Sequence, residues 1–224
     1  MTPSEKKWIR YLLHDLRNPL SAIKTSLQIR KIKRKKGDES GLDLLDETMS
    51  ESVKRLTLLM DMIQFTVQVD GEEGIRAEVS VPEMLNHFPG YLSRHEPDLL
   101  KTCQIEPSGS KMPLLIIPDL VDQVLVGLIL FASHVKTEGS KVFVFGKLNQ
   151  ILIVWQDASP GNYNSDLFSI EGQVDQKEAR QGTGFGIPLI FAHHAINEVL
   201  KGSISFQSDV TAGTVTLVIS LPVA

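Results

Sequence analysis

One histidine near the start of the chain has neighbours suited to phosphorus chemistry. His14, Asp15 and Asn18 lie within one short segment. A neutral imidazole nitrogen is a good nucleophile near neutral pH, because its unperturbed pKa is about 6.5. An adjacent carboxylate can orient the ring or accept a proton during the attack, and an amide one turn further on can hold a water. Such residues could support nucleophilic attack by the His14 ring, with Asp15 as the orienting acid or base and Asn18 as a water positioner, although a lone exposed histidine on a helix is more often only a solvated side chain.

The segment around this histidine has the apolar spacing of a helix. Residues 14, 17, 18 and 21 form its polar face, so we expect His14 to project into water. Pro19 removes one internal hydrogen bond and predicts a bend just after the histidine. The opposite face is an apolar stripe at three- and four-residue steps, made of Ile9, Leu12, Leu13, Leu16, Leu20, Ile23 and Leu27.

A second helix of the same rhythm follows after a charged turn, residues 31–41. Two such helices joined by a short loop form a hairpin, which cannot cover its own apolar stripe. We therefore expect residues 1–70 to be a helical hairpin that dimerises as a four-helix bundle. The apolar positions of the second helix are Leu45, Met49, Val53, Leu56, Met60 and Ile63.

The remaining residues, 71–224, mix strand and helix patterns after a predicted linker over residues 69–78. The whole chain is therefore predicted to be an α+β protein, in which an α/β layer domain follows the helical hairpin. Strands are predicted at 112–117, 141–148, 151–156, 203–207 and 214–221, and helices at 81–94, 120–134 and 187–200.

Glycines before the last predicted helix suit phosphate binding. Gly182, Gly184 and Gly186 precede an apolar segment. Glycines let backbone N–H groups approach a phosphate, and the positive end of the helix favours its charge. Such a run is a weak signal by itself, because a tight turn against a helix has the same pattern. Upstream, Asp157 follows a predicted strand and precedes Gly161.

Together these motifs resemble those of two-component histidine kinases. Residues 14–23, HDLRNPLSAI, are similar to the phosphoacceptor box of that family. Residues 154–161 and 182–222 are similar to the glycine boxes and last strands of its ATP-binding domain. The resemblance implies an α/β sandwich of the histidine-kinase ATPase type after the hairpin, with residues 162–181 as a polar lid over the nucleotide. It implies ATP as a candidate cofactor, with the adenine amino group on Asp157 and the rest of the nucleotide near Gly161, Gly182, Gly184 and Gly186.

The predicted nucleotide site departs from that family on the helix 120–134. The family has two asparagines four residues apart there, and the second one binds magnesium. The matching positions in this chain are Gly127 and Phe131, and neither side chain has the oxygen that a hard cation requires. Ser159 also replaces the first glycine of the first box. We therefore expect a degenerate ATP-binding domain, in which the replacement by Phe131 argues against magnesium-dependent use of ATP.

Composition narrows the partners and the environment. A net charge of −4 over 224 residues argues against nucleic acid as the main partner. The one cysteine, Cys103, excludes an intrachain disulfide and fits a reducing compartment. The histidines show no zinc spacing, so we expect no metal site. The longest apolar stretch, residues 124–132, is shorter than the roughly 18 residues of a membrane helix, so we expect no membrane segment and a cytoplasmic protein.

Three functions fit these observations. The first is a homodimeric phosphorelay protein, a phosphotransferase in which His14 accepts a phosphoryl group from one response-regulator aspartate and passes it to another. The resemblance implies that receiver domains of response regulators are the partners and dock near His14. The first alternative is an active ATP-dependent sensor histidine kinase that autophosphorylates on His14. The second is a non-catalytic interaction module of the pseudokinase type.

Overall fold

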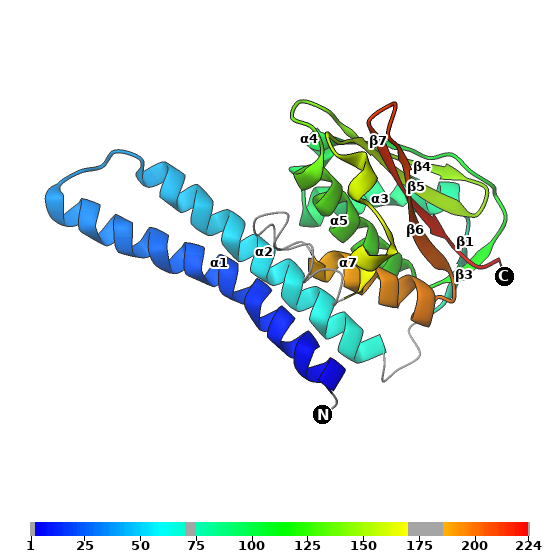
Figure 1. Cartoon of the computed structure of the whole chain (residues 1–224), viewed down its shortest axis with the longest axis horizontal. Helices are drawn as coiled ribbons and strands as arrows, with labels where there is room; N and C mark the ends of the chain where they lie inside the picture. Colours follow the sequence, from blue (N-terminus) through cyan, green and yellow to red (C-terminus); the bar gives the residue numbers. More distant parts are fainter. Residues whose placement is uncertain (1–2, 70–74, 170–185, 224) are drawn as a thin grey trace.

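The computed structural model describes residues 3–69, 75–169 and 186–223, which form a helical hairpin and an α/β sandwich (Figure 1). The hairpin consists of α1 (Pro3–Lys36) and α2 (Leu42–Val69). The sandwich lies against the second half of α2, while the tip of the hairpin extends away from it (Figure 1). The predicted α+β class, with the helices first and the α/β region second, is confirmed.

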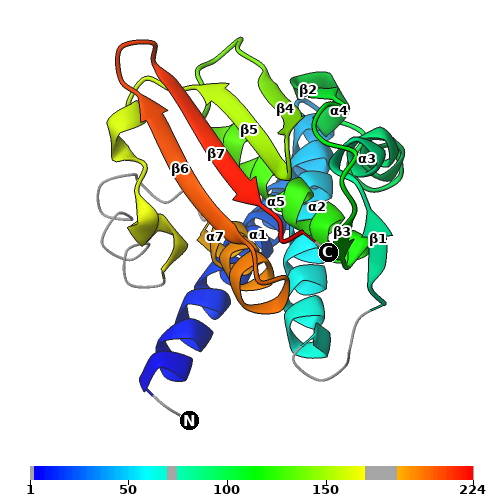
Figure 2. The same ribbon diagram turned by 90° about the vertical axis from the view of Figure 1, so that its right-hand side faces the viewer.

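A five-stranded sheet forms one layer of the sandwich (Figure 2). The pair β2–β4 is parallel and the other pairs are antiparallel. Four of the strands lie in predicted segments, whereas the short and largely polar β2 was not predicted. In spatial order the strands are β2 (Cys103–Glu106), β4 (Val142–Lys147), β5 (Gln150–Gln156), β7 (Thr214–Ser220) and β6 (Ser203–Asp209).

Helices form the other layer and cover one face of this sheet (Figure 2). They are α3 (Val81–His95), α5 (Pro118–Val135) and α7 (Gly186–His193), with the four-residue α4 (Leu99–Thr102) beside them. α3 begins with a capping box, in which Ser80 and Glu83 satisfy each other's backbone N–H groups. The predicted helix 187–200 is α7 followed by a π-helical segment, η3 (His194–Val199). Two short 3₁₀ segments, η1 (Pro160–Asn162) and η2 (Ser165–Phe168), follow β5.

The central helix of the sandwich is α5. By length and composition it could cross a membrane, with a mean hydropathy of 1.4 over 18 residues. The expectation of no membrane segment considered only residues 124–132, the longest uninterrupted apolar stretch of this helix. In the fold, 56% of this helix is buried, and its apolar residues belong to one hydrophobic core with the strands and with α7. This is the environment expected of a core helix.

Part of the predicted linker is a strand. β1 (Ala77–Val79) pairs antiparallel with β3 (Leu114–Ile116) in a separate two-stranded sheet. The prediction of a linker over residues 69–78 is therefore wrong at residues 77 and 78, which belong to β1, and at Val69, where α2 ends. A segment of three residues carries too little periodicity to be recognised as a strand from the sequence. It becomes a strand by pairing with β3, which lies far along the chain.

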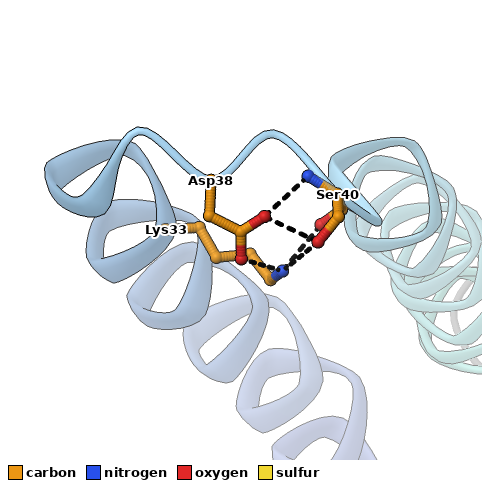
Figure 3. Close-up of polar contacts among 3 residues, drawn as sticks. All are labelled: Lys33, Asp38 and Ser40. Atoms are coloured by element: carbon orange, nitrogen blue, oxygen red, sulfur yellow. Dashed lines mark hydrogen bonds and ion pairs between the residues drawn. The ribbon is translucent and has the colours of Figure 1, made fainter.

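The turn of the hairpin is shorter than predicted. The expected turn over residues 31–41 is wrong for residues 31–36, which continue α1 to its end. Cations stabilise the C-terminal end of a helix through its dipole, so this basic run favours the extra helical turn. Lys33 then fixes the loop, because its Nζ donates to Asp38 Oδ2 at 2.8 Å and to the Ser40 carbonyl oxygen at 2.7 Å (Figure 3).

Candidate phosphotransfer and nucleotide sites

The candidate phosphoacceptor His14 lies within α1, but its side chain is outside the described part of the structure. The predicted projection of this side chain into water therefore stays a prediction. Two residues expected on the same face, Arg17 and Ser21, are exposed, and Asn18 is half-buried. α1 continues as one helix through Pro19, although proline has no backbone N–H to donate within a helix.

Asp15 lies inside the protein rather than on this outer face. Its exposed fraction is 0%, and its charge acts on Arg55 of α2. Burial lowers the pKa of the Arg55 guanidinium, and the carboxylate of Asp15 opposes that change. A cation close to a buried carboxylate favours its charged form. The residue next to His14 is thus anchored within the hairpin, which the helical spacing alone did not indicate.

The apolar stripe of the hairpin points outward. Leu13, Leu20 and Leu27 lie seven residues apart on α1, and each is more than half exposed. Val53 and Met60 of α2 have the same spacing, with exposed fractions of 51% and 62%. Residues seven apart lie along one side of a helix. A single chain therefore leaves these five apolar side chains exposed on its hairpin, and we call them the leucine stripe.

Asp157, the predicted adenine ligand, lies directly after β5. Its Oδ1 accepts a hydrogen bond from the Ser159 N–H at 2.7 Å, and its Oδ2 accepts one from the Tyr163 hydroxyl. Its own N–H donates to the Gly213 carbonyl oxygen at 2.9 Å. Both oxygens of the carboxylate therefore have hydrogen-bond partners within the chain.

Aromatic side chains fill the space between Asp157, α5 and the sheet. Trp155 and Phe131 are 1% and 4% exposed, and their rings meet edge to face at 6.1 Å. The Phe168 and Phe206 rings stack at 4.8 Å. Such pairs add about 0.5–1.5 kcal/mol each beyond the area that they bury. This aromatic cluster comprises Phe131, Trp155, Tyr163, Phe168 and Phe206.

The cluster places Phe131 where the resemblance expects a magnesium ligand. Its ring packs against Trp155, Tyr163 and Phe206 instead of presenting oxygen. Across the described residues, no group of three His, Cys, Asp or Glu side chains could hold a metal ion. The sequence identifies Phe131 as unable to bind magnesium but gives no sign of its aromatic partners, because they meet only in the folded chain.

The predicted glycine positions are only partly described. Gly182 and Gly184 lie outside the described residues, and Gly186 is the first residue of α7. Gly161 lies in η1, where an added Cβ would meet no atom within 4 Å, so packing does not require glycine there. In the predicted lid, the described residues 162–169 place Tyr163, Leu167 and Phe168 in the core, so this part is not the polar flap expected. Residues 170–181 of the lid lie outside the described part.

A cavity of about 380 Å³ lies between α2 and part of the sandwich. Lys54 lies at the rim of this cavity, where its Nζ is 3.5 Å from Asp98 Oδ2. Burial and the charge of Arg55 lower the pKa of His134 on the far wall. The cavity is lined from α2 by Glu51, Lys54, Arg55 and Leu59, and from the sandwich by Glu96, Asp98, Leu99, Leu130, Ser133, His134 and Pro188.

Comparison with known proteins identifies the fold of this chain. No protein-family model matches the sequence, and no curated protein matches it. Among solved structures, the chain is similar to the Acinetobacter baumannii histidine kinase AdeS, with a TM-score of 0.62, 18% identity, and coverage of 94% of this chain and 98% of that one. It is also similar to histidine kinase ThkA, solved in complex with the response regulator protein TrrA, with a TM-score of 0.62, 15% identity, and coverage of 97% and 61%. The chain therefore has the histidine-kinase fold, a helical hairpin followed by an α/β sandwich.

Proposed function

We propose that this protein is a phosphorelay component of two-component signalling, in which His14 exchanges a phosphoryl group with aspartates of response regulators. The observation that carries the proposal is the aromatic cluster together with the Tyr163–Asp157 hydrogen bond. They involve Phe131 and Asp157, two positions that the resemblance assigns to nucleotide and metal binding, while the phosphoacceptor-like segment lies within α1. A histidine without its own ATP source needs a donor that already carries an activated phosphoryl group, such as an aspartyl phosphate.

In the proposed reaction, the P–O bond to the receiver aspartate breaks as a P–N bond to the His14 ring forms. The ring becomes positively charged when its lone pair attacks phosphorus. The neighbouring carboxylate of Asp15 stabilises that charge or accepts the proton from the other ring nitrogen. Asn18, which is half-buried one turn along α1, is the proposed water positioner. The reverse sequence returns the phosphoryl group to a second receiver.

The proposed active form is a homodimer in the cytoplasm, where receiver domains are its partners. The leucine stripe supports a second copy of this chain as the occupant of that surface. Its seven-residue spacing is the pattern by which helices pack side by side in bundles, and it occurs on both α1 and α2. Pairing two hairpins would bury these side chains and leave the polar face of α1 open to receivers.

A second candidate, an ATP-dependent histidine kinase, is favoured by one observation. Asp157 remains at the end of β5, as the resemblance to that family expects. To use ATP, this site would have to break the Tyr163–Asp157 bond and open the aromatic cluster. It would also have to bind the metal through residues other than Phe131.

The test is phosphoryl transfer from a panel of phosphorylated receiver domains to the purified protein. The wild type is expected to gain acid-labile label, and His14→Ala is expected to gain none. His95→Ala removes an exposed histidine of α3 and should label as well as the wild type. Equal labelling of His14→Ala, or no labelling of the wild type by any receiver, would contradict the proposal.

A further inference from the structure

The cavity between α2 and the sandwich has an apolar lining contributed by four helices. Leu59 of α2 and Leu99 of α4 are 2% and 6% exposed. Pro188 of α7 is buried and Leu130 of α5 is half-buried. The volume of about 380 Å³ lies in the range of small-molecule sites, which are mostly apolar and often form where separate units of structure meet. The cavity therefore has the size and the lining to hold a small molecule with an apolar body.

One carboxylate at this cavity has no partner. Glu96 follows α3, is half-buried and lines the cavity. Its backbone N–H donates to the Leu92 carbonyl oxygen at 2.8 Å, but among the described residues its side chain has no hydrogen bond and no ion pair. Burial raises the pKa of this carboxyl group, and the charge of Lys54 opposes that increase only in part. A cation within hydrogen-bond distance would stabilise the charged form of Glu96.

The cations that line the cavity do not fill this role. Lys54 is 3.5 Å from Asp98 Oδ2, and in the described part of the chain neither Lys54 nor Arg55 forms an ion pair with Glu96. Glu51 adds a third carboxylate, which is exposed on α2. The lining thus holds three carboxylates and only two side chains that stay cationic, so it favours a positively charged ligand over a negatively charged one.

We propose that this cavity binds a small organic amine, whose ammonium group pairs with the carboxylate of Glu96. The apolar body of the amine lies against Leu59, Leu99 and Leu130. An ammonium group offers several N–H donors, and its hydrogen bonds to a carboxylate are stronger than those between neutral groups. Because the ligand contacts both α2 and the sandwich, its binding also stabilises the folded chain.

The experiment titrates the whole chain, labelled in its leucine methyl groups, with n-hexylamine and follows the methyl signals by NMR. n-Hexanol and hexanoate have chains of similar length, with no charge and with a negative charge. n-Hexylamine is expected to bind at least about 10-fold more tightly than n-hexanol, because it adds a hydrogen bond to a charged group. Hexanoate should bind more weakly than either. Magnetisation transfer should connect the hexyl chain to the methyl groups of Leu59, Leu99 and Leu130.

Glu96→Gln removes the charge and keeps the shape of the side chain. It should lower the affinity for n-hexylamine by about 10-fold and leave the affinity for n-hexanol unchanged. Glu47→Gln is the matched control, because it removes an exposed carboxylate of α2 that does not line the cavity. This control should bind n-hexylamine as tightly as the wild type does.

Three results would overturn the proposal. They are equal binding of n-hexylamine and n-hexanol by the wild type, tighter binding of hexanoate, and an equal loss of affinity in Glu96→Gln and Glu47→Gln. A lack of magnetisation transfer to the three leucines would overturn it as well. That measurement uses the wild type alone, so it remains decisive if Glu96→Gln does not fold.

Discussion

The hairpin and the sandwich distribute their polar and apolar groups in opposite ways. The hairpin buries polar side chains, Asp15 and Ser26 of α1 among them, and exposes the leucine stripe. The sandwich packs its expected ligand site with the aromatic cluster and satisfies Asp157 internally. Exposed apolar side chains of this kind are typical of a surface that packs against another protein. In the sandwich, two positions that the resemblance assigns to nucleotide and metal binding, Phe131 and Asp157, make their contacts within the chain.

The largest expected effect comes from opening the aromatic cluster. Trp155→Ala should lower the free energy of unfolding by about 3–5 kcal/mol, because it leaves a large cavity in the core. Phe143→Ala removes a ring of β4 that is 42% exposed, and it should cost under about 1 kcal/mol. Urea titration of both variants measures the difference. Similar small losses in both would mean that the site is not closed by packing.

The next effect tests the exposed surface of the hairpin. Leu27→Asp places a charge on the leucine stripe, far from His14 in the sequence, and should weaken self-association at least about 100-fold, or roughly 2.7 kcal/mol. Val210→Asp changes an equally apolar residue that is 70% exposed beyond β6, and the oligomer should be unaffected. Sedimentation velocity at several concentrations distinguishes them. A monomeric wild type would contradict the proposal that the leucine stripe pairs two hairpins.

Asp122 is a carboxylate of the sandwich that can be compared with the buried Asp15 of the hairpin. Burial, together with Asp119, raises the pKa of Asp122 to about 7, and Arg94 opposes this only in part. Between about pH 4 and pH 7 the folded chain keeps a proton that the unfolded chain releases, so this contribution to stability is lost as the pH rises.

Asp122→Asn has no such proton to lose. Between pH 5 and pH 8 the wild type should therefore lose about 1–2 kcal/mol more stability than this variant, a range discounted for partial exposure. Urea unfolding at the two pH values provides the measurement. Parallel pH dependence in both proteins would show that Asp122 ionises normally.

The smallest effect is expected where the two regions meet at the surface. Lys54 and Asp98 are 49% and 65% exposed in their side chains, and the ion pair is long. Such pairs contribute little in water. Lys54→Ala should leave the midpoint of urea unfolding unchanged within error, and a clear shift would mean that this contact holds hairpin and sandwich together.

Long, repeated patterns made most of the fold predictable. The three- and four-residue steps of the hairpin and the four longest strands each carry enough residues for a periodic signal. β1 and β2 were missed because three or four residues carry almost none. The helical end at residues 31–36 was missed because charged runs also form turns.

The candidate sites were less predictable, since they depend on contacts between distant segments. The helical wheel predicted the polar face around His14 but gave no indication that Asp15 lies buried near Arg55. Phe131 could be recognised as unable to bind magnesium. That it packs with Tyr163 and Phe206 follows only from the approach of α5, the loop after β5 and β6.

The most direct test compares two phosphoryl donors on one preparation of the wild-type protein. One sample receives γ-labelled ATP with magnesium, and the other receives a labelled phosphorylated receiver domain. Label is expected to reach His14 from the receiver and not from ATP. Label on His14 from ATP, at a rate comparable to that from the receiver, would contradict it and establish an active kinase.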